Sequence, residues 1–218
     1  SVISFGKAGQ YPHGVRQLGV GERGRRFLQW RLRWLLRRLR PELVHVHWAH
    51  FAVPLRKAWR GPLVVTAWGS DIYRREAFSD RDWNALGEAL RGAELVTCDS
   101  RDMALRLELE FGVLPQHIEV IQWGVDCDLF APSGPDFRET LGLVGREVVL
   151  SARNFTPLYN QHRVLAAFAA VLQHRPRAFL LMKNYRGDPA VLEAVRADIA
   201  QRGLEEHVRV LDEMPHEQ

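Results

Sequence analysis

Short apolar runs alternate with segments of helical pattern along most of the 218 residues, and this alternation limits the possible folds more than any other feature. The runs are nearly continuous and apolar, as expected for parallel strands buried on both faces. The predicted strands are residues 43–47, 63–66, 95–98, 118–121, 148–151, 178–182 and 208–211. The predicted helices are residues 22–39, 81–91, 101–111, 160–174 and 189–202. This order predicts an α/β fold built on parallel sheets.

Residues at the predicted helix ends support these boundaries. Gly112, Gly142 and Gly203 stand where a helix end favours a residue that tolerates positive φ. Ser100 and Asp188 stand where N-terminal caps are favoured, and Asp188 precedes a proline.

A segment rich in Pro, Gly and Ser interrupts the alternation at residues 131–135 and predicts a linker. We therefore expect a first domain at residues 1–131, a linker at 132–135 and a second domain at 136–218. The first residue is Ser and the last residues read as the start of a helix, so we also expect a piece of a longer protein in which both domains are incomplete.

Basic charge is concentrated near the N-terminus. Residues 1–60 contain 13 Lys and Arg against two acidic residues, whereas the other 158 contain 17 against 24. No uncharged apolar run approaches the roughly 18–20 residues of a membrane span. The two cysteines, Cys98 and Cys127, are too few for a disulfide scaffold and indicate reduced thiols in a cytosolic protein.

Most of this charge lies in one predicted helix, Arg25–Arg40, with an expected apolar stripe of Phe27, Trp30, Leu35 and Leu39 that Trp34 and Leu28 widen. Such a helix could simply pack its apolar side on the sheet. It could also lie on an anionic membrane or bind an anionic substrate. Nucleic acid is the least favoured partner, because no nucleic-acid motif accompanies the charge.

Three histidines, His45, His47 and His50, follow one another at the end of a predicted strand. Their spacing is poor for a metal site, and we expect none. Because open α/β sheets bind ligands beyond the carboxyl ends of their strands, His47 and Trp48 are candidates to line a cleft, with ordinary packing as the alternative.

Two more strand ends carry candidate residues. Trp68, Gly69, Ser70 and Asp71 form a turn in which Ser70 and Asp71 could hydrogen-bond to a polyhydroxyl ligand, although a structural turn with a helix cap is an equal alternative. Asp126 follows another strand, in a Trp-Gly-Val-Asp turn.

The first strand of the second half leads into Ser151-Ala152-Arg153-Asn154 and reaches a predicted helix at Asn160. An arginine beside a helix N-terminus suits a diphosphate. Arg153, Asn154 and Asn160 are therefore candidate diphosphate-binding residues, and a surface-loop arginine is the alternative.

Taken together and in this order, these motifs resemble retaining glycosyltransferases of family 4. The landmarks are the strand before His47, the Thr66–Asp71 turn, Asp99-Ser100, Gly124-Val125-Asp126 and Ser151–Arg153. The resemblance covers residues from about 40 to 218 and implies two facing Rossmann-like domains, the GT-B architecture.

The resemblance implies transfer of a sugar from a nucleotide-sugar to a lipid-linked, polysaccharide or other acceptor, with retained configuration. The first domain would hold the acceptor and the second the donor, with Arg153 on its diphosphate. No cofactor or metal ion is implied, because basic side chains and helix N-termini neutralise the leaving group. The catalytic residue stays unassigned.

Three departures from the family pattern leave a second interpretation open. Trp68 stands where the family often has His, and Leu158, Tyr159 and Asn160 stand where a Lys is usual, unless Arg163 or Lys183 replaces it. The glycine-rich loop and the paired glutamates of the family are not found in the chain. The alternatives are a non-catalytic nucleotide- or sugar-binding module and a basic interaction domain. We expect a cytoplasmic protein that can associate with a membrane.

Overall fold

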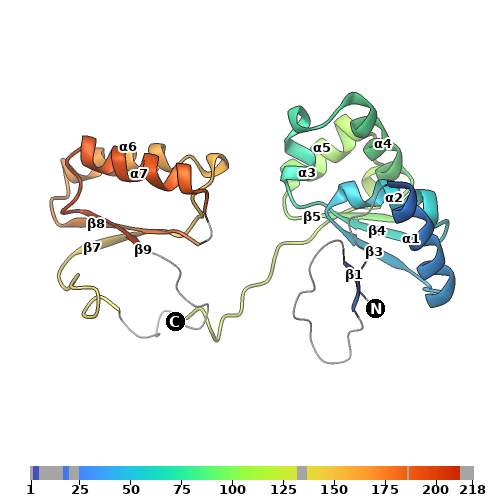
Figure 1. Ribbon diagram of the computed structural model, residues 1–218, viewed down its shortest axis with the longest axis horizontal. Helices are drawn as coiled ribbons and strands as arrows, with labels where there is room; N and C mark the ends of the chain where they lie inside the picture. The colour runs from blue at the N-terminus through green and yellow to red at the C-terminus, as the bar shows by residue number, and fades with distance from the viewer. Residues whose placement is uncertain (1, 5–16, 20–24, 132–136, 186, 212–218) are drawn as a thin grey trace. The chain divides into compact units, whose positions relative to one another are not determined.

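The computed structural model describes residues 2–4, 17–19, 25–131, 137–185 and 187–211. It divides into two compact units, Ser1–Asp126 and Cys127–Gln218 (Figure 1). The predicted first domain ran to residue 131, and the predicted linker at 132–135 lies outside the described residues. Each unit is described by itself.

The first unit is built on a four-stranded parallel sheet with the order β3-β4-β5-β6. Its strands are β3 (Val44–His47), β4 (Leu63–Thr66), β5 (Leu95–Cys98) and β6 (Ile118–Val120), close to the predicted ranges. A separate pair, β1 (Val2–Ser4) and β2 (Gln17–Gly19), is also parallel. Neighbouring strands follow one another in sequence, so right-handed crossovers put their connecting helices on one face.

The described residues of this unit form five helices: α1 (Arg25–Leu39), α2 (Ala52–Ala58), α3 (Ser70–Tyr73), α4 (Asp80–Arg91) and α5 (Arg101–Phe111). The sequence did not indicate α2 and α3, which are too short to show a helical period. Two 3₁₀ turns, Ala49–Phe51 and Arg75–Ala77, precede α2 and α4. A third, Pro115–His117, precedes β6.

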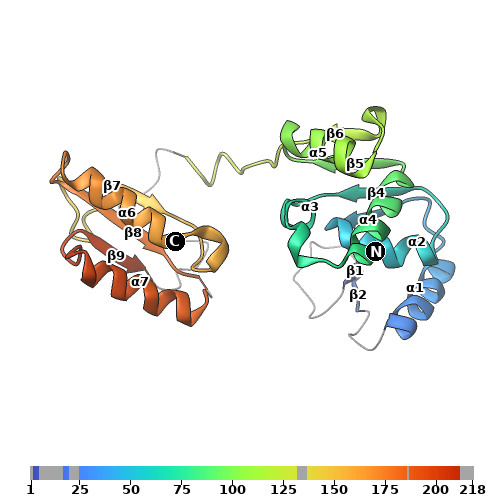
Figure 2. The same cartoon turned by 90° about the horizontal axis from the view of Figure 1, so that it is seen from above.

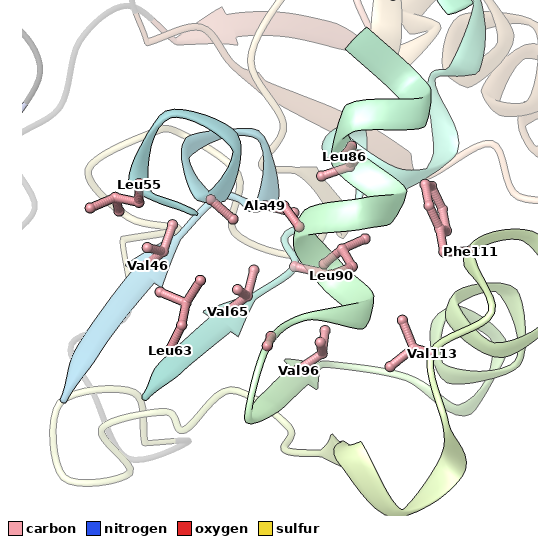
Figure 3. Packing of buried hydrophobic residues seen from close by; sticks show 14 of the residues in the cluster. Val46, Ala49, Leu55, Leu63, Val65, Leu86, Leu90, Val96, Phe111 and Val113 are labelled. Atoms are coloured by element: carbon pink, nitrogen blue, oxygen red, sulfur yellow. The ribbon is translucent and has the colours of Figure 1, made fainter. Parts of the chain in front are cut away.

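The core of the first unit lies between this helical layer and the sheet. Figure 3 shows Leu86 and Leu90 of α4 on the same side of the sheet as Val65 and Val96, all four almost fully buried. Removing such apolar area from water stabilises the unit by about 25 cal/mol per Å². Successive side chains of a strand point to opposite faces of the sheet. Because Val46 is buried on the helical side, His45 and His47 lie on the opposite face.

The second unit has a three-stranded parallel sheet of β7 (Glu147–Ser151), β8 (Ala178–Lys183) and β9 (Val208–Leu211), in that order. The helices in the described part of this unit are α6 (Gln161–Leu172), which follows the 3₁₀ turn Pro157–Tyr159, and α7 (Pro189–Gln201). Both lie on the same side of the sheet (Figures 1 and 2). The core joins Phe155, Leu165, Phe168, Leu180 and Met182.

The predicted helix ends are confirmed except at Gly142, which has φ of 68° but follows turn residues and not a helix in the described part of the chain. The Ser100 hydroxyl accepts a hydrogen bond from the Met103 amide, and the Asp188 carboxylate accepts one from the Ala190 amide. Gly112 and Gly203 have φ values of 67° and 62°, so they adopt the left-handed conformation that a side chain would make unfavourable.

Candidate functional site

A polar row crosses the carboxyl ends of three neighbouring strands in the first unit. His45 Nε2 and Thr66 Oγ1 share a hydrogen bond of 2.7 Å, and Thr66 Oγ1 and Thr97 Oγ1 share another of 2.7 Å. Burial lowers the pKa of His45, and the nearby His47 lowers it further. Both effects disfavour the protonated imidazole, and one ring nitrogen is fixed by the row. Sequence reasoning missed both threonines, although each stands at or next to the end of a predicted strand.

Aromatic rings continue this row along the same edge. The ring centres of His45 and His47 are 4.4 Å apart, and His47 meets Trp68 edge-on at 6.0 Å. Trp68 in turn lies 4.6 Å from Trp123, which follows β6. The side chains of Trp68 and Trp123 stay about half exposed, at 53% and 50%. The edge therefore exposes imidazole and indole rings, and it brings the candidate residues His47 and Trp68 together.

Asp71 does not line this edge. Its side chain is completely buried, and its two oxygens accept hydrogen bonds from the Ala49 amide (2.7 Å) and the Trp68 amide (2.9 Å). The predicted hydrogen bond to a polyhydroxyl ligand is therefore not the arrangement in the structure. Because both acceptors are used by backbone, Asp71 fixes the loop after β3 against the loop after β4.

The remaining predicted residues of this unit are at the surface. Gly69 has φ of 109°, a conformation that L side chains rarely adopt, and it lets the chain turn directly into α3. Ser70 is exposed in the first turn of α3. Asp126 is exposed in the segment after β6, beyond Trp123.

Trp48 has an unusual backbone for a tryptophan, with φ of 71° and ψ of 109°. Hydrogen bonds hold it there: its amide donates to the Thr66 carbonyl at 3.0 Å, and its carbonyl accepts from the Phe51 amide at 3.0 Å. Such strain costs on the order of 1–3 kcal/mol and is concentrated at functional sites. The Trp48 ring is 43% exposed and helps to line a cavity of about 420 Å³.

In the second unit, the loop after β7 carries the predicted diphosphate residues. The Arg153 guanidinium lies over the Tyr159 ring, 4.8 Å from its centre, and is exposed. The buried amide of Gln161 donates to the carbonyls of Arg153 (3.1 Å) and Asn154 (2.8 Å). Asn154 Oδ1 accepts from the Tyr185 amide at 3.0 Å. The loop is thereby fixed, with Asn154 in a supporting position and the Arg153 side chain directed outward.

Asn160 lies directly before α6 in the left-handed conformation, with φ of 51°. Its side chain makes no hydrogen bond to the first amides of α6 within the described part of the chain. A helix N-terminus of this kind attracts anions through its amides and its dipole. Lys183 ends β8, the strand beside β7, so it adds a cation to the same carboxyl edge. Arg163 is exposed in the first turn of α6.

The basic helix α1 differs from its predicted pattern. Leu32, Leu35 and Leu36 are buried in the core, whereas Trp30 and Trp34 are exposed at 64% and 47%. The expected stripe was wrong at Trp30 and Trp34, because packing against α2 selects the leucine side of the helix. Tryptophan and arginine thus share the outer face.

The described residues carry neither a metal cluster nor a membrane span. They contain no group of three or more His, Cys, Asp or Glu side chains that could hold a metal ion, and the prediction of a metal-free site stays a prediction. None of the described helices is long and apolar enough to cross a membrane.

The fold defines the class of protein. The structure of Anabaena Alr3699/HepE in complex with UDP matches with a TM-score of 0.74 at 22% identity, over 90% of this chain. Its complex with UDP-glucose matches with 0.73 at 21%, over 93% of this chain. Sucrose-phosphate synthase from Thermosynechococcus elongatus matches with 0.69 at 18%, over 88%. The architecture is that of the GT-B glycosyltransferases, with two Rossmann-like domains.

The sequence then gives the family. The model of Glycosyltransferase Family 4 matches residues 5–129, more than half of the chain, so this chain belongs to that family. It covers 55%, 57% and 50% of the three solved chains, which is about half of their length. No protein with a curated description matches the sequence.

Proposed function

We propose that this protein transfers a hexose from a nucleotide-sugar to an acceptor, with retention of configuration. The observation that carries the proposal is the family match over residues 5–129, combined with a fold whose solved examples include complexes with UDP and UDP-glucose. In this proposal the second unit holds the donor and the first holds the acceptor.

The donor diphosphate would bind at the loop after β7. Arg153 is exposed there and is oriented by Tyr159, and the amides of the first turn of α6 lie directly after Asn160. Lys183 would supply the cation that the family usually has a few residues after its arginine. These groups can neutralise a leaving diphosphate without a metal ion or cofactor, and the reaction is proposed to use neither.

The acceptor would bind at the aromatic edge of the first unit. His47, Trp68 and Trp123 offer ring faces, and the polar row behind them holds one nitrogen of His45. The strained Trp48 and the exposed Ser70 stand at the same ends of β3 and β4. The proposed setting is the cytoplasmic side of a membrane.

One observation favours a second candidate, a non-catalytic module that binds nucleotide or sugar. Trp68 stands where the family often has a histidine, and its indole packs against Trp123. Tryptophan in place of histidine makes this position one of ring stacking, and it removes a polar ring nitrogen that could contact the reacting groups.

The full chain, incubated with UDP-, GDP- and ADP-sugars and a panel of acceptors, separates the two candidates. Transfer with one donor, with retained configuration by proton NMR of the product, would support the enzyme. Nucleotide binding by calorimetry without transfer or hydrolysis across the panel would support the binding module. Absence of both would contradict both proposals.

A further inference from the structure

A cavity of about 420 Å³ lies in the first unit among α1, α2, α4 and the loop after β3. This volume is within the range of small-molecule sites. Three rings, those of Trp48, Phe51 and Phe78, form much of its wall. Val53, Pro54 and Ala85 complete the apolar part. None of these residues belongs to the polar row or to the diphosphate loop.

The aromatic wall is held in place before any ligand binds. Trp48 and Phe51 meet edge-on with ring centres 5.8 Å apart, and the His50 ring stacks on Phe78 at 3.7 Å. The strained backbone of Trp48 fixes the start of this wall. Because apolar rings in a preformed cavity cannot pair with water, the cavity favours a hydrocarbon group.

Charged side chains also line the cavity. Lys57 and Arg81 are exposed cations. Asp82 is the acidic residue of the lining, and its carboxylate accepts a hydrogen bond of 2.8 Å from the Ser79 hydroxyl. The buried Nε2 of His50 has no hydrogen-bond partner among the described residues. The net charge of the lining is positive, which complements an anionic group attached to the hydrocarbon.

Gln29 of α1 also lines the cavity, on the side of the helix that faces α2. The Arg33 guanidinium donates to the Lys57 carbonyl at 2.9 Å and so ties α1 to α2 next to the cavity. Exposed Trp34 and Arg38 lie on the opposite side of this helix from Gln29, with the guanidinium 5.4 Å from the ring centre. Trp and Arg on one exposed face suit an anionic bilayer, where each base contributes about 1 kcal/mol.

We propose that this cavity binds an anionic lipid that serves as the acceptor, with its hydrocarbon against Trp48, Phe51 and Phe78 and its phosphate at Lys57 and Arg81. The proposal rests on the proposed function, in which the first unit holds the acceptor. It names the acceptor class as a phosphate-bearing membrane lipid: the cavity holds its hydrocarbon and phosphate, and its sugar-accepting group lies at the aromatic edge, where Trp48 follows β3.

Calorimetry on the full chain without any donor tests the proposal, using decyl phosphate, inorganic phosphate and decyl glucoside as probes. We expect decyl phosphate to bind one to one and about tenfold or more tighter than the other two, because only it supplies both groups. Lys57→Gln with Arg81→Gln should weaken decyl phosphate binding about tenfold and leave decyl glucoside unchanged. The matched control is Arg60→Gln with Arg101→Gln, which removes the same charge outside the cavity.

Filling the cavity from α4 with Ala85→Phe should also abolish decyl phosphate binding, with circular dichroism to confirm that the variant folds. Equal binding of decyl glucoside and decyl phosphate, or loss of affinity in the control variant, would overturn the proposal. Inorganic phosphate bound as tightly as decyl phosphate would show a free phosphate site and would also overturn it. Because nucleotide binding is measured separately, these failures are distinct from a failure of the proposed function.

Discussion

The two units present different chemistry at the same place in their folds. At the carboxyl edge of the first sheet stand rings, namely His47, Trp68 and Trp123, behind which threonine hydroxyls hold His45. At the carboxyl edge of the second stand Arg153 and the open N-terminus of α6. Rings suit stacking on a neutral or apolar group, whereas guanidinium and amides suit an anion. One strand arrangement thus supports two specialised surfaces.

The units also share one way of holding their strand-end loops. In each, one completely or almost completely buried polar side chain satisfies backbone groups of the strand-end loops: Asp71 in the first and Gln161 in the second. The two side chains differ in their hydrogen-bonding role. The carboxylate of Asp71 accepts hydrogen bonds from two backbone amides, whereas the neutral amide of Gln161 donates to two backbone carbonyls. Buried polar groups of this kind are costly to leave unpaired, so loop geometry and unit stability depend on each other.

The largest effect on stability is expected when the buried hydrogen bonds of Asp71 are disrupted in the first unit. Asp71→Asn replaces one acceptor oxygen by an amide donor that faces a backbone N–H, so one buried N–H loses its partner. We expect a loss of about 3 kcal/mol in the free energy of unfolding, from hydrogen bonds to a charged group. Urea denaturation followed by tryptophan fluorescence measures it.

Two variants serve as controls for that prediction. Asp82→Asn changes a partly exposed carboxylate and should cost under about 1 kcal/mol. Gln161→Leu removes two neutral hydrogen bonds in the second unit and should cost about 1–2 kcal/mol. A cost for Gln161→Leu above that of Asp71→Asn would contradict the difference drawn between the units.

An intermediate effect is expected at the anion surface of the second unit. Arg153→Gln removes the cation oriented by Tyr159 and should weaken binding of a nucleoside diphosphate about tenfold or more, through one charge-assisted hydrogen bond. Calorimetry with UDP, GDP and ADP measures it. Arg196→Gln, on the exposed face of α7, is the matched control, and equal losses in both variants would refute the assignment of Arg153.

The smallest effect is expected on the pH dependence of stability in the first unit. Burial lowers the pKa of His45 below the ordinary value of about 6.5. As the pH falls through that value, the imidazole therefore binds a proton more readily in the unfolded chain than in the folded chain. Stability is therefore fully present above about pH 6.5 and falls as the pH decreases toward the folded pKa. His45→Gln should make stability fall less steeply between about pH 7 and 5.5. Identical slopes in both proteins would contradict the role of burial at His45.

Sequence patterns were sufficient for much of the fold. The strands β3 to β9 and the helices α1, α4, α5, α6 and α7 lie close to their predicted ranges, since each has a clear apolar period or cap. The patterns failed where an element is too short to show a period, as for α2 and α3. They also failed at Trp30, because hydropathy alone does not decide which apolar side chains of α1 face the core.

For the candidate site, the sequence by itself determined which residues follow the strands, and hence that His47, Trp68 and Arg153 stand at carboxyl edges. Local chain chemistry is enough for that, because strand ends and turns depend on near neighbours. Only the tertiary structure decided that Asp71 is buried between two loops and that residues from α1, α2 and α4 enclose one cavity. Those facts depend on contacts between distant segments, which no local pattern records.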